Sequence, residues 1–217
     1  MREFKTVSLA DQVFEKLESD IITGVYARGE YLTELKLVEN MGVSRTPIRE
    51  ALRRLAQEHL IEDTPKGTVV LGITVDDLID IMDIRQRIEG LAAYYATKNI
   101  TPAELDELRQ INELQDFYFA KKDIERLRQM DDRFHVAIYE MSKRNVLCDT
   151  LRPLHRKTQR YRRLSIGNDQ RLAHSIQEHK DIFNAIAEGN AELAAELITR
   201  HIGNAKQHMI ERFDYHG

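Results

Sequence analysis

The feature that most constrains the fold is a helical pattern that fills the last two thirds of the chain. From about Thr74 onward, apolar residues recur at helical spacing and start signals mark successive helices. The strongest signal is Thr101-Pro102-Ala103-Glu104, which supplies an N-cap, a proline at the first helical position and a capping carboxylate. Short connections between long helices predict an antiparallel bundle. We expect six helices, over about 74–99, 101–120, 123–141, 145–166, 169–188 and 190–214.

The first 73 residues show a different pattern, in which short helices are followed by strands. Helices are expected over about 8–23, 33–40 and 44–58, and two short strands over 61–64 and 68–73 flank a turn at Pro65-Lys66-Gly67. These are the only strands that the pattern indicates. The order of the elements is that of a winged helix-turn-helix. The predicted fold class is therefore mainly α, with a winged helix-turn-helix domain over 1–73 and an all-helical bundle of about six helices over 74–217.

Composition limits the class of protein. There is one cysteine, Cys148, so no internal disulfide framework is expected, and no apolar run reaches the length of a membrane span. The N-terminus lacks the apolar segment of a signal peptide. We therefore expect a cytoplasmic protein with no membrane partner. The net charge is −4, so any binding of nucleic acid depends on where the positive charges lie rather than on their number.

The predicted helix over 44–58 has the character of a DNA-reading helix. Arg45 and Arg49 follow at i+4 spacing beside Thr46, on the flank of an apolar stripe formed by Ile48, Ala51, Leu52 and Leu55. Arginines at the N-terminal end of a helix can bind guanine in the major groove. Lys66, at the tip of the wing, is placed to reach the backbone or the minor groove. The alternative is that these arginines form an ordinary solvated face.

The segment over 31–62, YLTELKLVENMGVSRTPIREALRRLAQEHLIE, resembles the DNA-binding domain of the GntR family of bacterial regulators. The hallmark is Gly-Val-Ser-Arg-Thr-Pro-x-Arg-Glu-Ala-Leu, and the resemblance covers about 65 residues. One departure is Leu35, where many FadR-like members have an arginine, which leaves Lys36 as a candidate phosphate contact. The resemblance implies that DNA is contacted by Ser44, Arg45, Thr46 and Arg49, with Gly67 in the wing.

Histidines and one carboxylate suggest a metal site in the second part of the chain. Asp131 and His135 lie at i, i+4 on one predicted helix, while His179 and His201 belong to two others. Three imidazoles and a carboxylate suit zinc, or manganese, nickel or iron where further ligands complete the shell. Spacing alone leaves a second interpretation open, because an Asp/His pair of this kind is commonly a hydrogen bond on a helix surface.

Segments 83–96, 130–145 and 175–202 resemble the three signature segments of the FCD domain, the effector domain of FadR-like GntR regulators. The resemblance spans about 75–212. It implies a divalent metal held by Asp131, His135, His179 and His201. A bound cation with open positions attracts a carboxylate or hydroxy-acid effector. Arg85 matches the family's arginine on the first helix of this domain, although it could instead form a salt bridge with Glu89 at i+4. Further candidates for effector contact are Arg133, Arg156, Arg160 and Arg163.

These observations favour a sequence-specific transcription regulator that is not an enzyme. We expect a homodimer on a near-palindromic DNA operator, controlled by a small organic acid bound at the metal site. Three alternatives remain: a metal sensor in which the ion is itself the effector, a metal-dependent hydrolase, and an architectural DNA-binding protein without a ligand.

Overall fold

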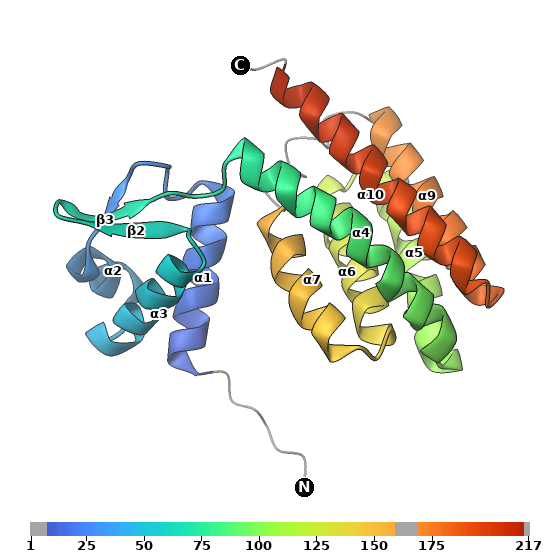
Figure 1. Cartoon of the computed structure of the whole chain (residues 1–217), viewed down its shortest axis with the longest axis horizontal. Helices are drawn as coiled ribbons and strands as arrows, with labels where there is room; N and C mark the ends of the chain where they lie inside the picture. Colours follow the sequence, from blue (N-terminus) through green and yellow to red (C-terminus); the bar gives the residue numbers. More distant parts are fainter. Residues whose placement is uncertain (1–7, 159–168, 215–217) are drawn as a thin grey trace, which may run out of the picture. The chain divides into compact units, whose positions relative to one another are not determined.

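The computed structural model describes residues 8–158 and 169–214, which form the helices and strands drawn in Figure 1. The chain divides into two compact units, Met1–Thr74 and Val75–Gly217. The two units are described separately below. Within the described residues, no helix combines the length and the apolar character that a membrane crossing needs.

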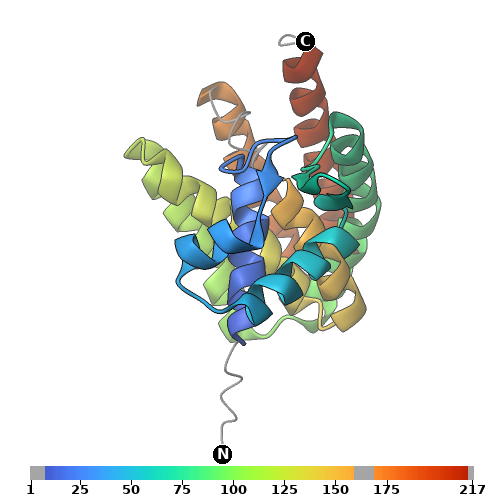
Figure 2. The same cartoon turned by 90° about the vertical axis from the view of Figure 1, so that its left-hand side faces the viewer.

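The first unit is a three-helix domain with a small sheet (Figures 1 and 2). Its elements are α1 (Leu9–Thr23), β1 (Tyr31–Leu32), α2 (Glu34–Met41), α3 (Arg45–Gln57), β2 (Ile61–Thr64) and β3 (Gly67–Val70). All strand pairs are antiparallel, and the strand order is β1-β3-β2. The expectation of only two strands is wrong, because Tyr31 pairs with Val69 and adds a third strand. A strand of two residues is too short to show an alternating pattern.

The apolar stripe of α3 faces the core of the first unit, as the sequence predicts. Ile48, Ala51 and Leu55 are fully buried, and they pack with Leu17 of α1 and Leu37 of α2 in one apolar cluster. Burial of this stripe leaves the opposite side of α3 directed outward. The core therefore fixes which side chains of α3 remain available to a ligand.

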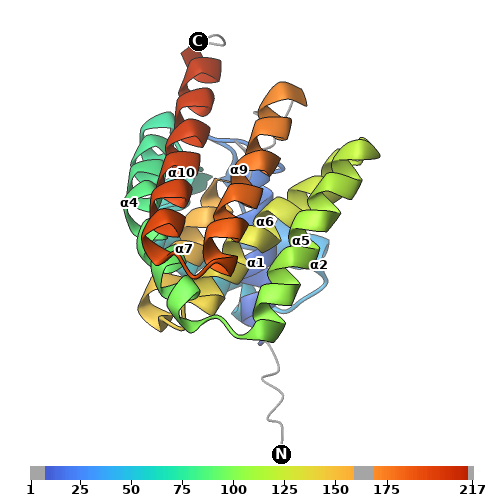
Figure 3. The same ribbon diagram turned by 90° about the vertical axis from the view of Figure 1, so that its right-hand side faces the viewer.

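The second unit is an all-helical bundle, seen from its right-hand side in Figure 3. Its helices are α4 (Val75–Asn99), α5 (Pro102–Ala120), α6 (Ile124–Met141), α7 (Asn145–Lys157), α9 (Asp169–Ala187) and α10 (Ala191–Asp214). The capping box predicted at Thr101 and Glu104 is present. Of the helix expected over 145–166, the part from 159 onward lies outside the described residues. The mainly helical fold class with its winged helix-turn-helix is confirmed.

Helices α4 and α10 lie side by side along much of their length (Figure 3). Gly90 stands where they approach closely: a Cβ atom at this position would lie 2.7 Å from the Thr199 hydroxyl and 3.3 Å from the Ala195 carbonyl oxygen. The interior of the bundle is apolar around Phe134 and Ile198. It also holds buried ionisable groups, which form the site described next.

Candidate metal centre and DNA-reading helix

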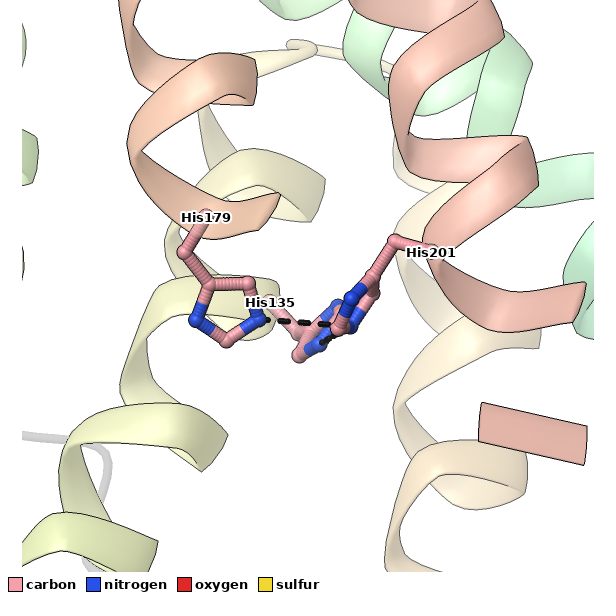
Figure 4. Close-up of side chains that lie close together, drawn as sticks. All are labelled: His135, His179 and His201. Carbon is pink, nitrogen blue, oxygen red and sulfur yellow. Dashed lines mark hydrogen bonds between the residues drawn. The ribbon is translucent and has the colours of Figure 1, made fainter. Parts of the chain in front are cut away.

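Three buried imidazoles meet in the second unit (Figure 4). His135 comes from α6, His179 from α9 and His201 from α10. The Nε2 atom of His201 lies 3.2 Å from Nε2 of His179 and 3.3 Å from Nε2 of His135. Each histidine occupies an inward position of its helix: Ile182, for example, lies three residues after His179 and is also fully buried. The amphipathic pattern of the helices therefore brings the three rings to one point.

The other nitrogen of each ring is held by an oxygen acceptor. The acceptors are Glu89 Oε2 for His135 at 3.0 Å, Gln115 Oε1 for His179 at 2.9 Å and Glu178 Oε2 for His201 at 2.7 Å. Because an ionised carboxylate or an amide oxygen only accepts, each Nδ1 is the protonated nitrogen that donates. The Nε2 atoms then carry lone pairs directed at one another. This is the tautomer that a metal-binding histidine adopts when an outer partner orients its ring.

The donor set fits a divalent cation. Two nitrogen lone pairs that face each other at 3.2 Å repel unless a positive charge lies between them. Zn–N bonds of about 2.0–2.1 Å at a tetrahedral angle place two nitrogens about 3.3 Å apart. The observed spacings match this value. Ligand atoms of His135, His179 and His201 all lie within 4.8 Å of one another.

The protonation of these groups agrees with metal binding. Burial lowers the pKa of His179 well below its ordinary value, and the neighbouring His201 lowers it further. Burial also lowers the pKa of His201. Burial alone would raise the pKa of Glu178, but its interactions with His201, Asn204 and Arg171 together outweigh burial, and the pKa falls to about 2. The result is neutral imidazoles oriented by an ionised carboxylate, which is the state that binds a metal.

The fourth predicted ligand, Asp131, lies at the edge of this group. Its Oδ1 is 3.8 Å from His179 Nε2, and its side chain is 25% exposed. Asp131 is one turn before His135 on α6, as the i, i+4 spacing requires. The structure therefore brings three of the four predicted ligands into contact and leaves the carboxylate beside them.

Arg85 forms the ion pair that the sequence offered as the alternative to effector contact. Its Nε donates to Glu89 Oε1 at 2.7 Å, and both side chains are buried, at 2% and 0% exposure. Its terminal nitrogens lie 3.1 Å from Thr158 Oγ1 and 3.1 Å from His155 Nδ1. Arg85 also lines the cavity beside the imidazoles. Its contact with an effector stays a prediction.

Sequence reasoning missed His155, which is buried on α7 and whose Nε2 lies 3.1 Å from Asp132 Oδ1. Its signal was its place four residues after the buried Leu151. His155, Glu89 and His135 also form a cluster with metal-ligand spacing. The Arg85 guanidinium already supplies a positive charge to that cluster, so it does not suit a second cation.

Of the remaining arginine candidates that the structure describes, neither Arg133 nor Arg156 lines the cavity beside the imidazoles. Arg133 pairs with Glu107 at 2.8 Å, and both side chains are about half exposed. Arg156 is partly buried on α7. Arg160 and Arg163 lie outside the described residues.

A cavity opens beside the three imidazoles within the second unit. Its walls come from α4, α5, α6, α9 and α10, together with Thr158. The volume of the cavity that is open to the centre of a water molecule is about 90 Å³. A single water needs roughly 10–15 Å³ by this measure, so a small organic molecule fits beside an ion.

In the first unit, α3 presents the predicted DNA-contacting side chains to solvent. Arg49 is 65% exposed, and its Nε donates to both carboxylate oxygens of Glu34 at 2.8 and 2.9 Å. Ser44 stands at the N-cap of α3, but its side chain makes no capping hydrogen bond. Sequence reasoning missed Glu34, because nothing in the spacing links the start of α2 to α3. The other predicted contacts, all exposed, are Lys36, Arg45, Thr46, Lys66 and Gly67.

A winged helix-turn-helix with an exposed basic helix, joined to a helical unit with a ligand-sized cavity, defines a class: the DNA-binding transcription regulators that carry a second, helical domain. Comparison with known proteins supports this class. Residues 9–70 match the bacterial regulatory proteins of the GntR family, and residues 80–204 match the FCD domain. The chain belongs to the GntR family and carries an FCD domain, as the resemblance implied.

Similar proteins are named as transcription regulators rather than enzymes. An HTH-type transcriptional regulator from an unstable DNA locus of Streptomyces ambofaciens is 31% identical over 195 residues, covering 88% of this chain and 80% of the relative. The HTH-type transcriptional repressor RspR of Escherichia coli is 27% identical over 198 residues, covering 91% and 87%. The solved structure of E. coli McbR has a TM-score of 0.81 at 25% identity, covering 96% of this chain and all of that one.

Proposed function

We propose that this GntR-family regulator binds a specific DNA operator as a homodimer, and that a small organic acid bound at a metal site changes its affinity for DNA. The observation that carries the proposal is the convergence of three imidazole Nε2 atoms, each on a ring whose Nδ1 is held by an acceptor. A histidine with a purely structural role does not require its Nε2 atom to lie 3.2–3.3 Å from the Nε2 atoms of two other histidines, as that of His201 does.

The metal would be held by His135, His179 and His201, with Asp131 beside them as the fourth ligand. When bound, a divalent cation such as zinc, nickel, manganese or iron supplies a positive centre whose open positions accept carboxylate oxygens. The adjoining cavity favours an organic effector over the ion acting alone, since a pure metal sensor needs no such space.

Glu89 provides a route from this site to α4. One of its oxygens accepts from Arg85 on the same helix, and the other contacts His135 on α6. Helix α4 begins at Val75, directly after the DNA-binding unit in the chain. A ligand that prefers one arrangement of α6 against α4 thereby favours one state of the linked DNA-binding units. The effect is limited to the difference in its affinity for the two arrangements.

On DNA, Arg45 and Arg49 would read base edges in the major groove. Ser44 and Thr46 would contact bases or phosphates at the helix N-terminus, where backbone N–H groups favour anions. Lys36, Lys66 and Gly67 would contact the backbone from α2 and the wing.

The metal site is tested with His179→Ala, and His174→Ala is its matched control because His174 lies exposed on the same helix. We expect wild type and His174→Ala to retain about one metal ion per chain by plasma mass spectrometry, and His179→Ala to lose it. DNA enriched from a random-sequence library by the wild type should still bind all three proteins. Equal metal content in the three proteins would rule out this ligand set.

The role of the effector is tested by measuring affinity for the same enriched DNA against zinc concentration, with and without added carboxylates. Our proposal expects the carboxylates to change the affinity at saturating zinc. A change produced by zinc alone, with no further effect of any acid, would instead identify a metal sensor.

A further inference from the structure

The cavity extends away from the imidazoles in one direction along α9 and α10. These helices are consecutive and antiparallel, joined by a short turn (Figure 3). Going backward from His179 on α9, the lining residues include Ile176 and Leu172. Going forward from His201 on α10, they include Ala205 and Met209. Both paths lead the same way, so the imidazoles form one end of an elongated space.

The wall along this path is mostly apolar, although Ser175 and His208 also line it. Leu127 of α6 packs with Leu172 and Ile176 in one buried cluster, and Met209 faces the same cavity from α10. Carbon atoms make up most of the surface that faces the cavity. A molecule rich in hydroxyl groups would lose hydrogen bonds to water here without replacing them.

The arginines of α6 and α9 that line the cavity already have acidic partners. Arg171 lies 3.0 Å from Oε2 of Glu178, the oxygen that also accepts from His201, so its guanidinium lies near the imidazole end. Arg128 of α6 lies 3.3 Å from Glu125. A second carboxylate on the ligand would have to compete with these glutamates for the arginines. The far end therefore suits an uncharged group better than an anionic one.

The helix positions give the length of the space. His179 and Leu172 are seven residues apart, which corresponds to about 10 Å at 1.5 Å per residue. An extended chain of about eight carbons has a similar length. We infer that the effector is an amphiphilic monocarboxylate, with its carboxylate at the imidazole end and an apolar body of about six to nine carbons. This inference rests on the proposed function, because it assumes that an acid binds at the metal site.

The test is isothermal titration calorimetry of the zinc-loaded full chain with acetate, butanoate, hexanoate and octanoate. Each added pair of carbons should lower the dissociation constant by about tenfold, since a buried methylene contributes about 0.8 kcal/mol. Suberate and gluconate serve as matched probes: suberate has the length of octanoate with a second carboxylate, and gluconate is a hydroxylated acid. Octanoate should bind at least tenfold tighter than either.

The possible outcomes separate the two hypotheses. Tighter binding of gluconate or suberate than of octanoate overturns the inference and leaves the proposed function standing. A dissociation constant that does not change with chain length also overturns the inference and leaves the proposed function standing. If zinc binds but no acid of either kind does, the organic-acid part of the proposed function fails, and the inference fails with it.

Two cavity variants test where the apolar body lies. Ala205→Leu narrows the path and should weaken octanoate at least tenfold while leaving acetate unchanged. Leu172→Ala lengthens the path and should move the optimum toward decanoate. Ala187→Leu, at the exposed end of α9 and absent from the cavity wall, is the control. A general structural defect would weaken all acids equally, so an unchanged chain-length preference in both variants would refute the placement.

Discussion

Replacement of Glu89 by glutamine should strongly destabilise the second unit. Glu89 is fully buried and lies 2.7 Å from the equally buried Arg85. Burial would raise the pKa of Glu89, but the charge of Arg85 and the interaction with His135 together outweigh burial and keep the pKa below its ordinary value, so the group is ionised. Glu89→Gln therefore leaves a buried guanidinium without its anion. Breaking a buried pair in this way costs about 3–5 kcal/mol.

For a unit of this size, such a loss corresponds to a fall in melting temperature of roughly 6–20 °C. The assay is thermal unfolding followed by circular dichroism in the presence of a chelator, so that metal binding does not contribute. Hydrogen exchange would assign the transition to residues from Val75 onward. Glu196→Gln is the matched control, because Glu196 and Arg200 form an exposed i, i+4 pair at 3.8 Å that should contribute less than about 1 kcal/mol. A loss no larger than that of the control would refute the reasoning.

Three further predictions concern single positions. Arg49→Ala should weaken binding to the enriched DNA by at least tenfold with the fold unchanged, measured by fluorescence anisotropy, whereas Arg200→Ala should leave binding unaltered. Lys66→Ala should weaken binding to all DNA sequences alike and lower the slope of log affinity against log salt by about one; an effect restricted to one sequence would contradict a phosphate contact. Gly90→Ala should destabilise the bundle by about 1–3 kcal/mol in urea titration, because the added Cβ would meet a hydroxyl at 2.7 Å and a carbonyl oxygen at 3.3 Å. Gly203→Ala should be nearly neutral, because its added Cβ would meet only the end of a flexible glutamine, so equal losses would contradict this reasoning.

The helices could be predicted from the sequence because their signals are local. The capping box at Thr101 and Glu104 and the turn before Arg45 each depend on residues a few positions apart. The strand Tyr31–Leu32 could not be predicted, since its only support is pairing with residues 68 and 69, far along the chain. Long-range pairing leaves no periodicity in two residues.

The candidate site divides in the same way. The i, i+4 relation of Asp131 and His135 is local, and the family resemblance supplied His179 and His201. The oxygen atoms that accept from the three imidazole rings could not be predicted from the sequence. Gln115 meets His179 across 64 positions, and Glu89 meets His135 across 46. These contacts depend on how α4 and α5 pack against the other helices, which local spacing does not determine. Glu178 had one signal, its place next to His179 in the sequence.

The buried charges of the second unit contribute to the orientation of the site more than to stability. Replacing a buried ion pair by apolar groups of similar volume is often neutral or stabilising, whereas removing one partner is costly. We therefore expect the double variant Arg85→Met/Glu89→Leu to unfold near the wild-type temperature in chelator, unlike Glu89→Gln. The same variant removes the acceptor of His135 Nδ1, so zinc affinity should fall by roughly 10–100-fold in competition with a chromogenic chelator. A variant that keeps both stability and zinc affinity would show that the ion pair does not orient the histidine. A variant as unstable as Glu89→Gln would show instead that the pair is needed for the packing of α4.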